Sequence, residues 1–385
     1  MSDIIYLDNN ATTKPLAEVV AAMTPLLSTG YANPSSVHRF GQNVRHQVEQ
    51  ARAQVAALVN AEPKEIVFTS GGTEAINLAI RGTLLADPIR RHLITSTVEH
   101  SAVHRLANRL SKEGYEVDRI DVDGEGRLDF AALEAKTRDD TALISLMHAN
   151  NETGVLFDVD RICRFASDRG IRLHVDAVQA AGKVPIDVKR SSVDLMSLSA
   201  HKMHGPKGVG ALYVRKRTRL SPLFTGGRQE RDLRPGTENA PAIVGFGVAA
   251  ESAEPWVNGG VHSVRALRDE FENRVLDAIP VAHVIGRGAP RVCNTSNIGF
   301  ERIQSEAILM LLSERGVCAS AGAACSSGSL EPSHVLGSMG VDTRIGHGAI
   351  RFSLSRFTTP TEIRSSVDVL TEVIERLSAT LPRIP

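Results

Sequence analysis

Short apolar runs recur between residues 66 and 215, and segments with a helical spacing of apolar residues separate them. Several of the runs are continuous rather than alternating, which is typical of strands that helices cover on both faces. The predicted strands are residues 66–70, 93–97, 116–122, 142–148, 172–176, 194–199 and 210–215. Helical patterns lie between them, for example at 74–85, 102–113 and 159–169. This alternation predicts an α/β fold with a large, mainly parallel sheet.

A different pattern follows a Gly- and Pro-rich stretch at 225–236. A chain of 385 residues is too long for one typical core. We therefore predict a large α/β domain at residues 15–255 and a smaller α+β domain made of residues 1–14 and 256–385. The later pattern predicts helices at 237–253, 263–278, 305–315 and 361–378, and strands at 297–300 and 350–354.

Charge and cysteine content narrow the classes of function. The chain has 44 basic and 44 acidic residues, so its net charge gives no reason to bind nucleic acid or an anionic membrane. It has no run of roughly eighteen apolar residues and no signal-peptide pattern at its start, so we expect a cytoplasmic protein. Its four cysteines lack zinc-site spacing, and we expect neither a disulfide framework nor an intrinsic metal site.

Two of the predicted strands deliver polar residues to the carboxyl edge of the sheet. One ends in Asp176, with Gln179 shortly after it, and the other runs into Ser199, His201 and Lys202. Pyridoxal phosphate (PLP) requires a lysine for its Schiff base, an acid for its pyridinium nitrogen and donors for its phosphate. Either stretch alone is compatible with an ordinary polar strand end, but the two together predict a PLP site.

A candidate phosphate site follows the first predicted strand, where Gly71-Gly72-Thr73 opens a helix. Paired glycines let backbone N–H groups approach an anion, and the start of a helix favours negative charge. The motif is neither a Walker A loop nor a GxGxxG sequence, so it does not indicate a nucleotide. The alternative is a glycine turn in which Thr73 is the helix N-cap.

Two more strand ends carry candidate side chains. His100 is suited to lie on a cofactor ring and to exchange protons, with an ordinary loop histidine as the alternative. The amide of Asn151 is suited to hold a substrate carboxylate or a cofactor oxygen, although asparagine-rich turns also form for backbone reasons.

Longer motifs make the assignment specific. They are residues 6–13 (YLDNNATT), 33–38 (NPSSVH), 174–179 (HVDAVQ), 201–202 (HK), 234–239 (RPGTEN) and 324–334 (ACSSGSLEPSH). With these motifs the chain resembles, essentially end to end, the PLP-dependent cysteine desulfurases of the NifS and IscS type, which are class-V aminotransferase-like enzymes. The resemblance implies a type I, aspartate-aminotransferase-like fold and a homodimer.

The resemblance also assigns roles around the cofactor ring. Lys202 would form the Schiff base and, once released, remove the substrate Cα proton. Asp176 would pair with the pyridinium nitrogen, and Gln179 would donate to the ring hydroxyl oxygen. His100 would stack on the ring and assist proton transfers.

The remaining roles concern the phosphate and the substrate. Asn151 and Arg351 would hold the substrate carboxylate, for which the arginine fork is well suited. Lys207 and Lys183 are rival Schiff-base lysines, but Lys207 sits in a Gly-Pro turn and Lys183 lies beyond the strand end. The phosphate would be bound by Gly72, Thr73, Ser199 and His201, with Thr237 from the second subunit.

Cys325 lies in a run of small residues with almost nothing to pack into a core. The resemblance implies that its thiolate attacks the sulfur of L-cysteine, which yields L-alanine and a persulfide on Cys325. The persulfide would supply sulfur for iron–sulfur cluster assembly through a scaffold or another acceptor protein. Such sulfur transfer implies at most a transient contact between Cys325 and an iron–sulfur cluster. Cys318, on a predicted strand, is expected to be structural.

Two alternative functions stay open. A selenocysteine lyase or another PLP-dependent, aminotransferase-like enzyme would share the lysine machinery without needing Cys325. A degenerate fold that serves as an iron–sulfur or redox scaffold is less favoured, because the cysteines lack cluster spacing. Such a scaffold would also have no chemical need for Lys202, Asp176 and His100.

Overall fold

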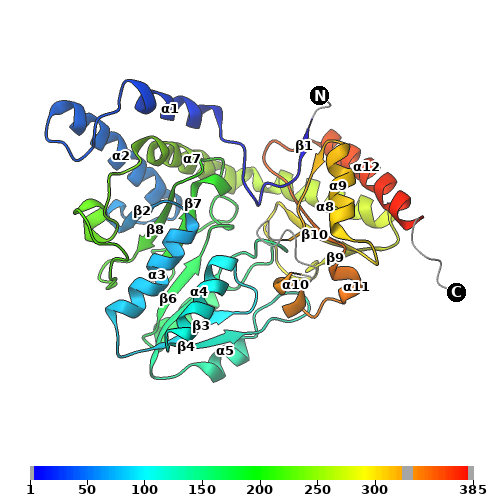
Figure 1. The fold of residues 1–385 in the computed structure, drawn as a ribbon, viewed down its shortest axis with the longest axis horizontal. Helices are drawn as coiled ribbons and strands as arrows, with labels where there is room; N and C mark the ends of the chain where they lie inside the picture. Colours follow the sequence, from blue (N-terminus) through cyan, green and yellow to red (C-terminus); the bar gives the residue numbers. More distant parts are fainter. Residues whose placement is uncertain (1–3, 323–332, 380–385) are drawn as a thin grey trace.

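The computed structural model describes residues 4–322 and 333–379. Its largest sheet consists of β2 (Ile66–Thr69), β3 (His92–Ser96), β4 (Glu116–Ile120), β5 (Thr141–Met147), β6 (Arg172–Asp176), β7 (Leu195–Ser199) and β8 (Gly210–Val214). The strand order is β2-β8-β7-β6-β5-β3-β4 (Figure 1). Strand β8 is antiparallel to both β2 and β7, and the other pairs are parallel. The predicted, mainly parallel α/β sheet is confirmed.

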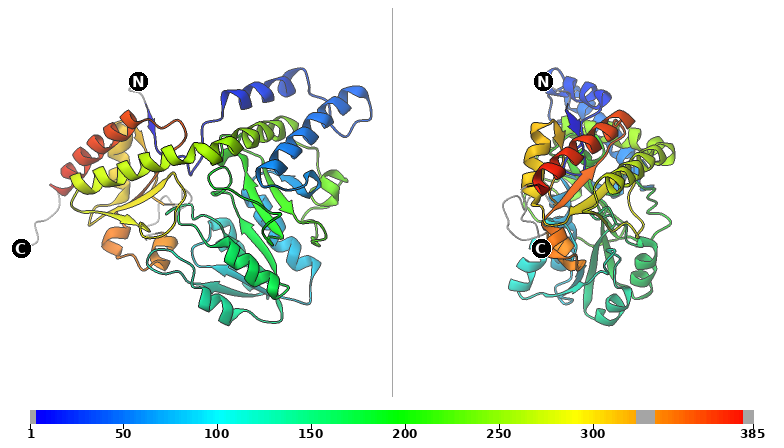
Figure 2. Two further views of the ribbon diagram at one scale, coloured as in Figure 1. Left: turned by 180° about the vertical axis from the view of Figure 1, so that it is seen from behind. Right: turned by 90° about the vertical axis from the view of Figure 1, so that its right-hand side faces the viewer.

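The helices around this sheet are α1 (Ala17–Ser28), α2 (Arg39–Leu58), α3 (Gly72–Ala86), α4 (Ser101–Lys112), α5 (Phe130–Lys136), α6 (Val159–Asp168) and α7 (Ala240–Gly259), with short 3₁₀ helices η1 (Pro63–Glu65), η2 (Ala200–Lys202) and η3 (Gln229–Asp232). The α-helices cover both faces of the large sheet. Leu93 and Leu143 pack with α3 and α4. The next residues along the two strands, Ile94 and Ile144, point into the core that α2, α6 and α7 cover. Figures 1 and 2 show α4 and α6 on opposite faces of the sheet.

A second, smaller group of strands and helices lies beside the large sheet (Figure 2), and it has a hydrophobic core of its own. This core surrounds an antiparallel sheet in the order β12-β10-β9 and a parallel pair β1–β11, with Phe271, Phe300 and Phe352 fully buried. The elements are β1 (Ile5–Tyr6), β9 (Ala282–Ile285), β10 (Thr295–Phe300), β11 (Val317–Cys318), β12 (Ala349–Ser353), α8 (Val261–Ala278), α9 (Ser305–Glu314), α10 (His334–Ser338), α11 (Thr343–Gly346) and α12 (Pro360–Ser378). The domain boundaries given above stay a prediction.

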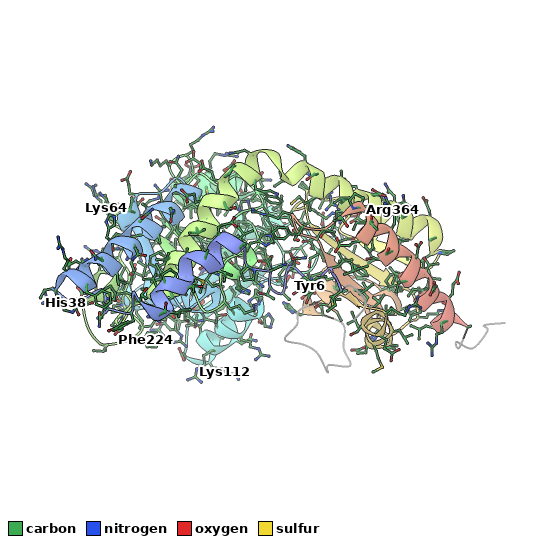
Figure 3. All side chains as sticks on the ribbon, turned by 90° about the horizontal axis from the view of Figure 1, so that it is seen from above. Tyr6, His38, Lys64, Lys112, Phe224 and Arg364 are labelled. Carbon is green, nitrogen blue, oxygen red and sulfur yellow. The ribbon has the colours of Figure 1, made fainter. Side chains whose placement is uncertain are left out.

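The N-terminal segment runs between the two cores. Leu7 packs into the second core, while the backbone N–H of Thr13 donates to the main-chain oxygen of His201, next to the large sheet. Figure 3 shows Tyr6 between His38 at one end of the molecule and Arg364 toward the other. The N-terminal segment is therefore part of the boundary between the two cores, and it would contribute to any site formed there.

Helix α7 differs from the predicted helix at 237–253. It begins at Ala240 because Asn239 caps it, accepting a hydrogen bond from the backbone N–H of Ala242. It also continues past Pro255 to Gly259, although proline removes one backbone donor inside a helix. Within the described part of the chain, no helix has the length and apolar character that a membrane crossing requires.

Candidate active site

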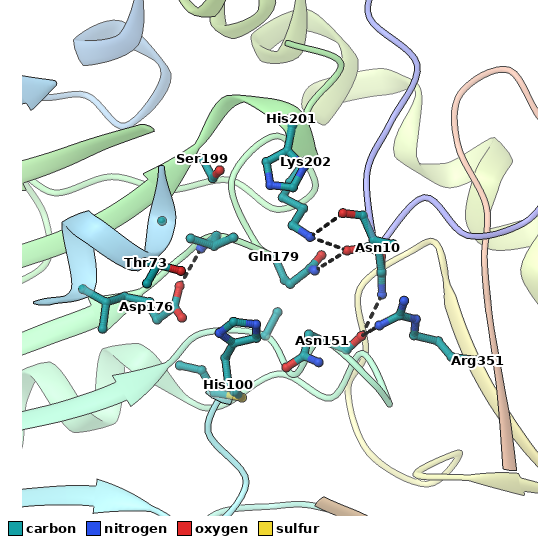
Figure 4. A pocket seen from close by; sticks show the side chains of 16 residues that line it. Asn10, Thr73, His100, Asn151, Asp176, Gln179, Ser199, His201, Lys202 and Arg351 are labelled. Carbon is teal, nitrogen blue, oxygen red and sulfur yellow. Dashed lines mark hydrogen bonds between the residues drawn. The ribbon is translucent and has the colours of Figure 1, made fainter. Parts of the chain in front are cut away.

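A pocket of about 240 Å³ lies at the carboxyl ends of the parallel strands, where the two cores meet (Figure 4). Its walls come from the N-terminal segment, the first turn of α3, the start of α4, the ends of β5, β6 and β7, and β12. The lining residues are Asn10, Ala11, Gly72, Thr73, Ile76, His100, Met147, Ala149, Asn151, Asp176, Val178, Gln179, Ser199, His201, Lys202 and Arg351. Ten of the predicted site residues are thus brought together by segments far apart in sequence.

Lys202 enters the pocket from η2, directly after β7. Its ammonium group donates to the main-chain oxygens of Asn10 and Ala11, the latter at 2.9 Å. The two rival lysines are placed differently, because Lys207 is exposed and Lys183 does not line this pocket. The pocket that contains Asp176 and Gln179 therefore presents Lys202 as its lysine.

Asp176 is the last residue of β6 and is 6% exposed. Its Oδ1 accepts a hydrogen bond of 3.0 Å from the backbone N–H of Val178. Burial raises the pKa of Asp176 to about 6, against the lowering effect of that hydrogen bond and of the Lys202 charge. Because burial disfavours the charged form of this carboxylate, a cationic partner in the pocket would stabilise it.

His100 is the N-cap residue of α4, and its Nδ1 accepts a hydrogen bond of 3.1 Å from the backbone N–H of Ala102. The neutral ring must therefore carry its proton on Nε2. Burial, together with the charges of Lys202, His334 and Arg351, lowers the pKa of His100 to about 4. At neutral pH this ring is an uncharged donor.

Gln179 lies in the turn after β6, and both ends of its amide are engaged. Its Nε2 donates to the main-chain oxygen of Asn10 at 3.0 Å. Its Oε1 accepts from Nζ of Lys183 at 2.8 Å. The sequence motifs assign no role to Asn10, although it lies in the N-terminal motif at 6–13, and Lys183 is predicted only as a rival Schiff-base lysine.

The other side of the pocket is suited to an anion. Gly72 and Thr73 form the first turn of α3, and a Cβ added at Gly72 would lie 2.8 Å from the side chain of Val178. Oγ of Ser199 is buried and has no hydrogen-bond partner among residues 4–322 and 333–379. Nδ1 of His201 lies 3.2 Å from Oγ1 of Thr12, and burial with the nearby Lys202 charge lowers the pKa of this histidine to about 4.

Arg351 of β12 closes the pocket from the second core and is 2% exposed. Its Nη1 donates to the main-chain oxygen of Asn151 at 3.1 Å, and its Nη2 donates to Oδ1 of Asp8 at 2.8 Å. Both Nε of Arg351 and Oδ1 of Asn151 are buried without a partner in the described structure. The neighbouring Asn150 instead folds its own turn, since its Oδ1 accepts from the backbone N–H groups of Glu152 and Thr153.

Thr237 and Cys325 are the two remaining predicted site residues. Thr237 is exposed in the loop before α7 and does not line the pocket of the single chain. Cys325 lies outside the described residues. Cys318 is on β11, as predicted, paired in parallel with Tyr6 of β1.

Comparison with known proteins covers nearly the whole chain. Residues 5–365 match the family described as aminotransferase class-V. A protein of Trichormus variabilis named cysteine desulfurase 2 is 52% identical over 379 residues, which are 98% of this chain and 95% of that protein. The solved structure of a NifS-like protein aligns with a TM-score of 0.91 at 36% identity, covering 97% of this chain and all of that one. A structure described as SspA in complex with cysteine gives a TM-score of 0.81 at 34% identity, covering 92% and 99%. The chain therefore belongs to the class-V aminotransferase family and, within it, to the cysteine desulfurases.

Proposed function

We propose that this protein is a PLP-dependent cysteine desulfurase that converts L-cysteine to L-alanine and retains the sulfur as a persulfide on Cys325. The observation that carries the proposal is the position of Lys202, whose amine enters one pocket together with Asp176 and Arg351. The relatives named cysteine desulfurase, and the solved structure that holds cysteine, support the same substrate.

The residues of the pocket fit PLP. Within the described part of the chain, the hydroxyl of Ser199 has no hydrogen-bond partner beside the first turn of α3, where a phosphate oxygen would accept a hydrogen bond from it. Asp176 lines the pocket and would pair with the ring nitrogen, and Gln179 would offer an N–H group. When bound, PLP would supply an electron sink for the substrate Cα. Gly72, Thr73, Ser199 and His201 would hold its phosphate.

Lys202 would hold the cofactor through its amine and, once released, take the proton from the substrate Cα. The main-chain oxygens of Asn10 and Ala11 orient this amine within the pocket. His100 would protonate a reacting group from Nε2, since its Nδ1 is engaged with the backbone of its own helix. The substrate carboxylate would bind at Arg351 and Asn151, whose Nε and Oδ1 atoms are buried without a partner among the residues that the structure describes.

The proposed sulfur transfer balances without an external oxidant. The thiolate of Cys325 attacks the substrate sulfur, an S–S bond forms, and the substrate C–S bond breaks. The electron pair of the broken bond stays with the three-carbon fragment, which takes up protons and leaves as L-alanine. The persulfide sulfur would then pass to an acceptor for iron–sulfur cluster assembly. A homodimer, in which Thr237 reaches the partner's phosphate site, and a cytoplasmic location belong to the same proposal.

The test is to incubate the PLP-loaded protein with L-cysteine and a thiol reductant, and to measure alanine and sulfide. Wild type should release both in equal amounts, and Cys325→Ala should release neither. Borohydride should fix the cofactor to Lys202. Full activity of Cys325→Ala would overturn the role of the thiol, and a wild type that binds no PLP would overturn the proposal as a whole.

A further inference from the structure

Lys183 is a buried lysine to which the proposed chemistry gives no role. The turn that follows β6 is helical in character, because the backbone N–H groups of Ala181 and Val184 donate four residues back, to Ala177 and Ala180. Residues four apart on such a turn lie on one side, so Lys183 stands beside Gln179. Lys183 is 8% exposed and lies outside the lining of the site pocket.

The contact between these two residues has a fixed direction. Nζ of Lys183 lies 2.8 Å from Oε1 of Gln179 and 3.4 Å from Oδ1 of Asn10. An ammonium group has only donors, so it requires the oxygen end of each amide to face it. The nitrogen end of Gln179 must then face the pocket side, where it donates to the main-chain oxygen of Asn10.

The direction of the Asn10 side-chain amide is also set by its hydrogen bonds. Its Oδ1 accepts from Nδ2 of Asn294 at 3.1 Å, and its Nδ2 donates to Oγ1 of Thr295 at 2.8 Å. The main-chain oxygen of Asn10 is the group that receives both Gln179 and Lys202. One buried cation thus sets the orientation of two amides at the wall of the pocket.

We propose that Lys183 is a positioning residue that holds Gln179 with its N–H group toward the cofactor, so that Gln179 donates to the ring hydroxyl oxygen and cannot turn its carbonyl there. This inference deepens the proposed function and rests on it. Without Lys183, the amide of Gln179 would present either end to the pocket, and a carbonyl facing an ionised ring oxygen would be repelled.

The direction of the amide does not depend on the charge of Lys183 alone. Burial lowers the pKa of Lys183 to about 7, with the Cys293 thiol acting against that lowering and the charges of Lys202 and Arg351 adding to it. The ammonium form only donates, whereas the amine form also has a lone pair that accepts. In the amine form, which can still donate to Oε1, the direction is kept by Nε2 of Gln179, which donates to the main-chain oxygen of Asn10, a group that only accepts.

The test uses the visible absorption of the PLP-loaded protein and the affinity of the cofactor-free protein for PLP, neither of which depends on turnover. Lys183→Met should weaken PLP binding about tenfold and raise the pH of the visible absorption change by about one unit, because a donor to the charged ring oxygen is lost. Lys207→Met, which removes an exposed lysine near the same site, is the matched control and should change neither.

Two further variants separate positioning from simple loss of packing. In a Gln179→Met background, Lys183→Met should have no additional effect on either measurement, because the two residues act as one unit. Gln179→Glu keeps the contact with Lys183 but removes the donor, and it should shift the absorption change as Lys183→Met does. The inference would be overturned if Lys183→Met or Gln179→Glu behaved like wild type. It would also be overturned if Lys183→Met had its full effect in the Gln179→Met background. Either result would leave the proposed function intact. A wild type that binds no PLP would instead overturn the proposed function.

Discussion

Nη2 of Arg351 and Oδ1 of Asp8 form an ion pair of 2.8 Å that joins β12 to the N-terminal segment. The side chain of Arg351 is 3% exposed and that of Asp8 is 18% exposed. The guanidinium that we propose for the substrate carboxylate thus already holds one carboxylate at the mouth of the site. An incoming carboxylate must share this cation with Asp8 or displace it.

Asp8→Asn should therefore lower the KM for L-cysteine. The amide oxygen still accepts a hydrogen bond from Arg351, but it no longer competes as a charge, and we expect a KM roughly threefold to tenfold lower. The kcat should change little. Steady-state kinetics on alanine release checks this, with the exposed Asp139→Asn as a control. A KM that rises in Asp8→Asn would mean that Asp8 mainly orients Arg351 for the substrate, rather than competing with the substrate carboxylate for it.

Arg351→Lys should raise the KM for L-cysteine, opposite to the effect of Asp8→Asn. A lysine has a point charge in place of the planar fork, so it cannot hold Asp8 and a second carboxylate together. We expect the KM for L-cysteine to rise about tenfold or more, while PLP absorption stays as in wild type. An unchanged KM would place the substrate carboxylate elsewhere.

His174 should make the protein less stable in mild acid. Its Nδ1 lies 2.8 Å from Oγ of Ser145, and its Nε2 lies 2.8 Å from Oγ of Ser197, both in the buried sheet. Burial lowers its pKa to about 3, so the folded state resists a proton that the unfolded state takes up below pH 6.5. The stability that neutral His174 contributes is complete above pH 6.5 and is lost as the pH falls toward the folded pKa, at about 1.4 kcal/mol per pH unit.

Urea unfolding of wild type and His174→Gln at pH 7 and pH 5 measures this contribution. The free energy of unfolding of wild type, minus that of the variant, should shrink by about 2 kcal/mol between the two pH values. A difference that is constant with pH would show that His174 is not the titrating group.

A buried ion pair should anchor the loop that leads to Thr237. Arg52 and Glu230 form two contacts of 2.7 Å, and Oε2 of Glu230 also accepts from the backbone N–H of Phe68 at 2.8 Å. Glu230 and the next two residues have φ values of 47°, 57° and 65°, a left-handed turn that costs energy in residues other than glycine. Glu230→Gln should lower the free energy of unfolding by about 3–5 kcal/mol, since a buried charge loses its partner.

Urea unfolding of a double-mutant cycle tests this pair. Arg52→Met with Glu230→Leu should cost much less than the sum of the single changes, because neither charge is then left alone. Glu113→Gln, in the more exposed Arg81–Glu113 pair, is the control and should have a far smaller effect. Additive costs at Arg52 and Glu230 would contradict the coupling.

Cys318→Ala should keep alanine and sulfide production. Burial, followed by the charge of Asp8, raises the pKa of the Cys318 thiol, so little thiolate is present at neutral pH. Burial likewise raises the pKa of Cys293, and that of Cys163 to about 11. Alkylation followed by mass spectrometry should therefore find slow reaction at all three positions. Loss of activity in Cys318→Ala would show that this thiol takes part.

The large sheet could be predicted because both its faces are buried. Strands of that kind are apolar at consecutive positions, and β2 to β8 all overlap the predicted segments. The short strands β1 and β9 could not be predicted in this way, because half-exposed strands of two or four residues carry too little apolar pattern. Helices α1 and α2 are absent from the predictions as well, although α2 buries an apolar stripe that includes Val44, Val48 and Val55.

The pocket could be predicted from strand ends, since the carboxyl ends of parallel strands share one edge. Asp176, Ser199 and Lys202 are examples. Lys183 and Asp8 were not assigned roles because their importance depends on contacts across the fold, with Gln179 and Arg351. Neither contact produces a hydrophobic periodicity or a motif that can be recognised in a single sequence.

The hydrogen bond from the backbone N–H of Asn10 to Oγ of Ser353 links positions 343 residues apart. During synthesis, the segment that helps to build the pocket leaves the ribosome well before its partner strand β12 is made. The large sheet can form while residues 8–11 are still without their final contacts. The lysine site is therefore completed only after β12 has been made, and a truncated chain that lacks β12 would have the strands of the site but not its closing wall.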